Sequence, residues 1–139
     1  MPDSQAVAIT LKSFDGTDTS VQQLRGELVQ GASGIYIRYE EPEPGPKGGS
    51  TRTTVRISGN EIKVLRHGEI QSQQTFGAGQ RHPGFYRSPF TTFNLSTDTK
   101  SVEIRLNGAE GTLGWVYDLY VYEELAGRFT ISLQIQEEA

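Results

Sequence analysis

The stretch FTISLQIQ, residues 129–136, alternates apolar and polar side chains without a break. Successive side chains of a β-strand point to opposite faces, so a period of two indicates a strand with one buried face and one wet face. The apolar face would carry Phe129, Ile131, Leu133 and Ile135. This stretch therefore predicts an all-β fold class.

The same period of two recurs along the chain, in residues 7–11, 35–39, 55–57, 62–64 and 102–106. No segment has a helical period, so we expect little or no α-helix. Turn-forming residues separate the runs, at 58–61, 66–69, 107–108 and 124–128. Consecutive hairpins favour an antiparallel up-and-down meander of roughly eight to ten strands, closed into a barrel. A β-sandwich is the alternative, but sandwiches usually need longer crossover connections.

The length and composition predict one domain over residues 1–139, and they limit the classes of partner that it could bind. A net charge of −4 argues against binding to nucleic acid or to an anionic membrane surface. The N-terminus has no signal-peptide pattern, and no apolar run is long enough to cross a bilayer. The chain has no cysteine, which suits a reducing compartment. We therefore expect a cytoplasmic protein.

Two segments differ from the short turns. Residues 41–50 contain the acidic, proline-rich EPEPGPKGG, and proline removes strand hydrogen-bond donors. This segment is predicted to be an extended, mobile loop. Residues 77–90 mix glycine, proline, histidine and aromatic residues, and they are predicted to form a long loop of the kind that often carries function.

The sequence offers no catalytic or metal-binding motif. No glycine-rich stretch has the lysine and strand-to-helix setting of a phosphate-binding loop. The two histidines, His67 and His82, are too few for a zinc site. The adjacent carboxylates Glu40 and Glu41 would point to opposite faces of a strand. We assign no catalytic residue, metal or cofactor.

The candidate ligand-binding residues are polar and aromatic: Tyr36, Arg38, Glu40, Arg66 and Tyr86. An arginine among them could fork a carboxylate or phosphate while the tyrosines stack on a flat group. The competing interpretation is an outer surface with cross-strand ion pairs. A simple parity count favours it for the first three residues, because it turns residues 35, 37 and 39 toward the core.

The stretch GWVYDLYVYEE, residues 114–124, carries aromatic side chains on both faces. Trp115 and Tyr117 would share one face, and Tyr120 and Tyr122 the other. A strand that is apolar on both sides is covered on both sides. The stretch therefore predicts a ligand-lined interior, or an oligomer formed through its outer face.

Five motifs follow one another along the chain: GIYIRYEE, TRTTVRISGNEIKVLRHGE, FYRSPF, LSTDT and GTLGWVYDLYVYEELAGRFTISLQI. Together they resemble the YwiB-like family of small bacterial proteins. The resemblance implies a calycin or lipocalin-like barrel and a domain of unknown function. It also implies recurrent positions, which fall on Tyr39, Glu40, Arg66, Gly68, Tyr86 and Thr97.

Three functions remain open. The first is a non-enzymatic lipocalin-like barrel that binds a small, partly apolar or anionic ligand. The second is a protein–protein interaction module, monomeric or homodimeric through residues 114–124. The third is a small-molecule hydrolase, which would require Glu40 or His82 to lie in a cleft.

Overall fold

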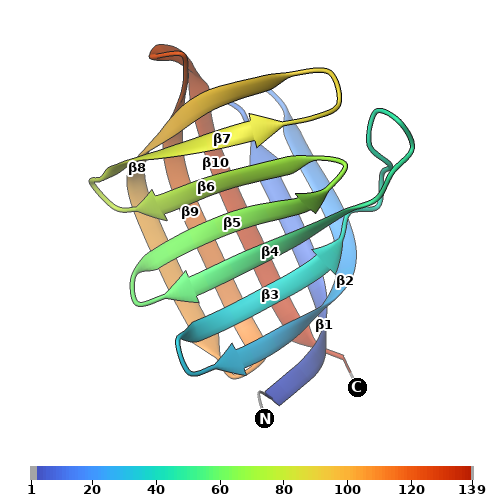
Figure 1. Cartoon of the computed structure of the whole chain (residues 1–139). Coiled ribbons are helices and arrows are strands. Elements are labelled where there is room, and N and C mark those ends of the chain that lie inside the picture. Colours follow the sequence, from blue (N-terminus) through green and yellow to red (C-terminus); the bar gives the residue numbers. More distant parts are fainter. Residues whose placement is uncertain (1–2, 139) are drawn as a thin grey trace.

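The chain forms a closed antiparallel barrel of ten strands, seen in a computed structural model that describes residues 3–138 (Figure 1). Each strand pairs with its neighbours in the chain, and β1 closes the ring against β10. The strands are β1 (Asp3–Phe14), β2 (Thr19–Gly31), β3 (Gly34–Glu40), β4 (Thr51–Ser58), β5 (Glu61–Gly68), β6 (Gln71–Gly77), β7 (Arg81–Arg87), β8 (Thr92–Asn107), β9 (Glu110–Val121) and β10 (Glu124–Glu137). The predicted closed up-and-down meander is confirmed, and the sandwich is excluded.

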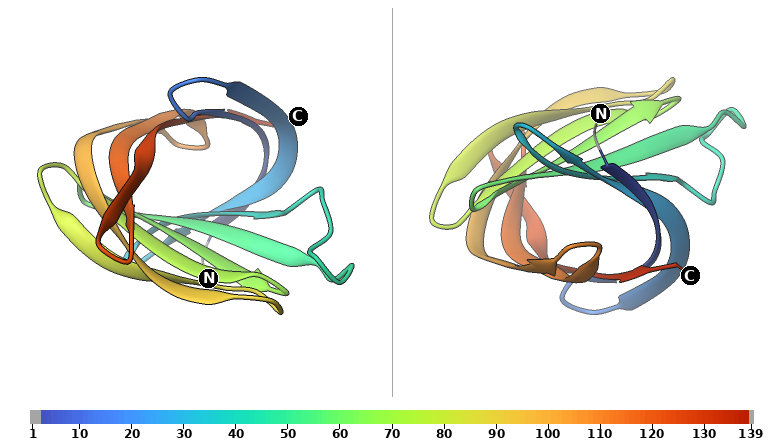
Figure 2. Two further views of the ribbon diagram at one scale, coloured as in Figure 1. Left: turned by 90° about the horizontal axis from the view of Figure 1, so that it is seen from above. Right: turned by 90° about the horizontal axis from the view of Figure 1, so that it is seen from below.

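The apolar strand faces that the sequence predicted do point into the barrel. At the closure, Ile9 lies opposite Ile135 and Leu11 lies opposite Leu133, so two sequence-distant strands share one interior face. The fully buried apolar side chains are Phe76, Ile9, Leu28, Ile37, Ile62, Leu113, Leu133, Val7 and Val55. Figure 2 shows the ring from its two ends, with the loop after β3 projecting at one side.

The predicted long loop at residues 77–90 is wrong, because half of it is strand β7. This strand runs from Arg81 to Arg87 and pairs with β8 over its full length. On its other side, β7 pairs with β6 only through residues 85–87. Pro83, which has no amide hydrogen, lies outside that stretch, so a proline is tolerated inside the strand. The glycine and proline content made this segment resemble a loop in the sequence, although it is a strand that is only partly paired on its β6 side.

The predicted turn at residues 124–128 is also misplaced. The last hairpin turns at Tyr122 and Glu123, whose φ angles are 51° and 66°. Two successive residues with positive φ are typical of the two-residue hairpin turn that matches strand twist. Gly127 lies instead within β10, beside a register shift between Leu125 and Gly127. Gly127 therefore marks a β-bulge, a place in strands where glycine is common.

Residues 41–50 contain no strand, as expected, and they wrap around one carboxylate. Glu69, which follows β5, accepts hydrogen bonds from the backbone amides of Lys47 at 2.9 Å and Gly49 at 3.0 Å. Gly45 and Gly49 pass so close to this side chain that an added Cβ would meet it. The chain between β3 and β4, here called the proline loop, is therefore tied to the barrel at its far end. Its mobility remains a prediction.

No helix that is long and apolar enough to cross a membrane occurs in residues 3–138.

Candidate ligand-binding cavity

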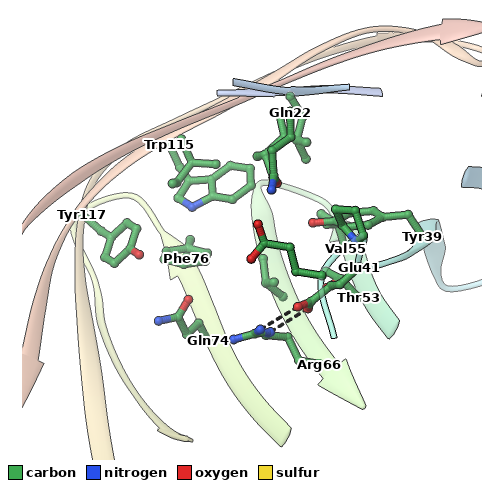
Figure 3. Close-up of a pocket in the computed structure, with 16 residues that line it drawn as sticks. Gln22, Tyr39, Glu41, Thr53, Val55, Arg66, Gln74, Phe76, Trp115 and Tyr117 are labelled. Atoms are coloured by element: carbon green, nitrogen blue, oxygen red, sulfur yellow. Dashed lines mark hydrogen bonds and ion pairs between the residues drawn. The ribbon is translucent and has the colours of Figure 1, made fainter. Parts of the chain in front are cut away.

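A cavity of about 360 Å³ lies inside the barrel and is bordered by the start of the proline loop (Figure 3). Strands from both sides of the ring contribute to its wall. Its lining residues are Leu11, Gln22, Tyr39, Glu41, Pro42, Glu43, Thr53, Val55, Val64, Arg66, Gln74, Phe76, Trp115, Tyr117, Ile131 and Leu133. The size and the apolar majority are typical of pockets for small molecules.

One side of the cavity is aromatic. The ring of Phe76 lies 5.3 Å from that of Trp115 and 4.6 Å from that of Tyr117, measured between centroids. Burial raises the pKa of Tyr117 to about 12, while hydrogen bonding by Gln74 opposes the shift. The indole nitrogen of Trp115 is buried and has no hydrogen-bond acceptor among residues 3–138. This wall therefore offers flat apolar surface and contains one buried donor without a partner.

The opposite side is polar and built around an ion pair. Arg66 donates from Nε and Nη2 to the two carboxylate oxygens of Glu41, at 2.8 and 2.7 Å. Thr53 donates to the same carboxylate at 2.7 Å. Burial alone would raise the pKa of Glu41, but the hydrogen bonds from Arg66 and Thr53 and the charge of Arg66 hold it below its ordinary value. Glu41 in turn raises the pKa of Arg66. The pair therefore stays ionised at neutral pH.

Strand register explains why these polar side chains meet. Tyr39 lies directly opposite Thr53, and Thr53 lies directly opposite Arg66. Residues directly opposite in neighbouring strands share a face, so all three point into the barrel. Burial is the leading cause of the raised pKa of Tyr39. Glu41 follows the end of β3 and completes the group from the proline loop.

The structure places the five candidate ligand-binding residues in different surroundings. Only Arg66 lines the cavity. Ser72 lies opposite Arg66, and Tyr86 lies opposite Ser72, so Tyr86 belongs to the same row of inward-facing residues. Its ring stacks on that of Phe93 at 5.0 Å, however, and does not line the cavity.

The other three lie on the outer face, as the parity count predicted. Arg38 lies over the Tyr36 ring at 5.6 Å, and Glu40 pairs with Arg52 at 3.1 Å. Arg38 and Glu40 border a separate shallow depression of about 270 Å³ on the outer surface. Of the five candidate residues, only Arg66 therefore lies in the cavity with Glu41, Thr53 and the aromatic side chains.

The residues that the sequence analysis missed are chiefly Glu41, Glu43 and Thr53. The sequence analysis set Glu41 aside because Glu40 and Glu41 point in opposite directions. That statement is correct, but the two glutamates that line the cavity together are Glu41 and Glu43. Each of these glutamates precedes a proline and is therefore restricted to extended conformations. In an extended segment, residues two apart project to the same side. The pattern EPEP, residues 41–44, was therefore the sequence signal that could have predicted two glutamates on one side of the loop.

The hydrolase hypothesis finds no support in this geometry. Glu40 is on the outer surface, and His82 lies 4.0 Å from Glu61, measured between Nε2 and Oε2. Neither residue lines the cavity. Within the part of the chain that the structure describes, no group of three histidine or carboxylate side chains could hold a metal ion.

The aromatic strand β9 is divided between the two faces as its pattern predicted. Trp115 and Tyr117 are buried inside. On the outside, the guanidinium of Arg81 covers the Tyr120 ring at 4.0 Å, so part of this face is covered by the chain itself. Tyr122 remains 67% exposed.

Comparisons with known proteins agree with this architecture. The chain is 30% identical over 90 residues to the uncharacterized β-barrel protein YwiB of Bacillus subtilis (strain 168). The aligned region covers 65% of this chain and 61% of YwiB, so it spans less than two thirds of that relative. The crystal structure of the ywiB protein from Bacillus subtilis has a similar fold, with a TM-score of 0.82 at 22% identity, covering 99% of this chain and 96% of that one. A model of the domain of unknown function DUF1934 matches residues 7–133, and the chain therefore belongs to this family of YwiB-like β-barrels.

Proposed function

We propose that this protein binds a small, partly apolar ligand inside its barrel. The observation that carries the proposal is the two-sided cavity, with Phe76, Trp115 and Tyr117 on one side and the Glu41–Arg66 pair on the other. Apolar walls with a few fixed polar groups supply both affinity and orientation for a small molecule. The volume of about 360 Å³ accommodates one such molecule.

The donors of Arg66 argue against a simple anionic ligand. Both of its nitrogens that face Glu41 are engaged by that carboxylate. An anion could use them only by displacing Glu41, which would leave a half-buried carboxylate without its partner. A neutral or partly apolar ligand carries no such cost.

The proposal is tested by native mass spectrometry of the protein purified from its own host. We expect an added mass on the folded protein, released on denaturation. The matched variant is Val64→Phe, because Val64 lines the cavity and a larger side chain there would fill it. The variant should keep its fold, checked by circular dichroism, and lose the added mass. An identical added mass on the variant would contradict binding inside the barrel.

A second candidate function is self-association through the β9–β10 hairpin. Tyr122 and Leu125 are 67% and 61% exposed, and they lie close together in the sequence of this hairpin. Light scattering over micromolar concentrations tests it, because a homodimer would double the mass as concentration rises. A constant monomer mass would contradict it.

A further inference from the structure

We infer that the cavity selects small organic cations, an ammonium group on an apolar body, with Glu43 as the counter-charge. This inference rests on the proposed function and adds the sign of the ligand's charge. Three charged side chains line the cavity: Glu41, Glu43 and Arg66. Glu41 and Arg66 neutralise each other through two hydrogen bonds. One negative charge, that of Glu43, is left uncompensated.

Glu43 is a solvent-exposed residue at the border of the cavity, and its carboxylate has no salt-bridge or hydrogen-bond partner within residues 3–138. Arg66 is the only arginine or lysine of the lining in this part of the chain, and it is occupied by Glu41. A cationic ligand would therefore gain a partner at Glu43. A carboxylate would meet repulsion from Glu43 and find no open donor on the Glu41-facing side of Arg66.

The backbone around Glu43 is restricted before any ligand arrives. Pro42 and Pro44 fix their own φ angles, and Pro44 restricts Glu43 to extended conformations. The far end of the proline loop is held by Glu69 through the amides of Lys47 and Gly49. A restricted carboxylate loses less conformational freedom on binding than one on a free loop.

The aromatic wall provides an independent observation for the same class of ligand. The negative faces of aromatic rings attract cations as well as apolar groups, and Phe76, Trp115 and Tyr117 supply such rings. Trp115 is only 4% exposed, and its indole donor has no partner in the described chain. The indole N–H can donate a hydrogen bond to an oxygen of a ligand that reaches it, such as a hydroxyl. Amines and amino alcohols with an apolar body match these features together.

The test is a set of titrations followed by the fluorescence of Trp115, the only tryptophan of the chain. The probes are phenethylamine, phenethyl alcohol and phenylacetate, which share an apolar body and are cationic, neutral and anionic at pH 7. We expect the amine to bind about five- to tenfold more tightly than the alcohol, and the acid to bind weakest. Added salt should reduce the preference for the amine.

The decisive variant is Glu43→Gln, which removes the charge and keeps the shape. It should bind the amine and the alcohol with equal affinity while its affinity for the alcohol is unchanged. The matched control is Glu103→Gln, which removes one charge from an outer side chain that is 71% exposed and should leave all three affinities unchanged. Equal binding of all three probes by the wild type, or tightest binding of phenylacetate, would overturn the charge assignment and leave the cavity function standing. Failure of every probe to bind would instead contradict the cavity function itself.

Discussion

At the scale of single residues, the meaning of Arg66 depends on a partner that is distant in sequence. A free arginine inside a barrel is a ready receptor for carboxylate or phosphate. Here Glu41 occupies it through a bidentate pair, and Thr53 adds a third hydrogen bond to the same carboxylate. The exposed fractions of the two charged side chains are 30% for Arg66 and 19% for Glu41. The pair therefore fixes one polar side of the cavity, and in the proposed ligand selection the binding charge is that of Glu43.

Removing this carboxylate charge should destabilise the fold in a pH-dependent way. Glu41→Gln should lower the free energy of unfolding at pH 7 by about 1–3 kcal/mol, because Arg66 keeps its charge and loses its partner. The lowered pKa of Glu41 means that its stabilisation is complete above its ordinary pKa, about 4.3, and is lost as the pH falls through the lowered value. Urea unfolding across this range should show wild type and variant converging in acid.

The control for this prediction is Glu40→Gln. It breaks the pair with Arg52, in which both side chains are 60% exposed, and should cost less than about 1 kcal/mol. A Glu41→Gln deficit that stayed constant down to acid pH would show that the ion pair is not its cause.

Arg38 tests the assignment of the outer face. Arg38→Ala should change the free energy of unfolding by less than about 1 kcal/mol, because the side chain is 40% exposed and its nearest carboxylate contact, to Glu27, is 4.0 Å. Chemical denaturation measures this directly. A markedly larger loss would mean that Arg38 is buried and paired, against the parity of β3.

At the scale of elements, alternation alone predicted most strands and their inward faces. The strand around Ile37 and the strand around Leu133 were readable because one face is buried and the other is wet. Strand β7 was not, because Pro83 and Gly84 resemble loop residues and the strand is only partly paired toward β6. The turn at Tyr122 and Glu123 was missed because neither residue is a usual choice for positive φ.

The proline loop yields a prediction at this scale. Glu69→Gln should weaken the charge-assisted hydrogen bonds from the Lys47 and Gly49 amides. We expect hydrogen exchange at these two amides to accelerate about tenfold, while the global free energy of unfolding changes by less than about 1 kcal/mol. The amide of Glu41 bonds to the Thr51 carbonyl at 2.9 Å and serves as the internal control. Unchanged exchange at Lys47 and Gly49 would mean that Glu69 does not hold the loop.

At the scale of the whole molecule, closure of the ring creates the cavity. Trp115 on β9 and Arg66 on β5 are far apart in the chain, and they line the same space because β1 joins β10. The sequence predicted the barrel, Arg66 as a candidate binding residue, and the shared face of Trp115 and Tyr117. It did not predict the Glu41–Arg66 pair or the unfilled space, because both depend on register across neighbouring strands and on how completely side chains fill the interior.

The most direct test of a binding cavity uses the indole N–H signal of Trp115, a single peak in a ¹H–¹⁵N correlation spectrum. Titration with phenethylamine should move this peak progressively in the wild type and leave it unmoved in Val64→Phe, where the space is filled. A stationary Trp115 peak in the wild type, with shifts confined to outer residues such as Arg38 and Arg52, would contradict binding inside the barrel.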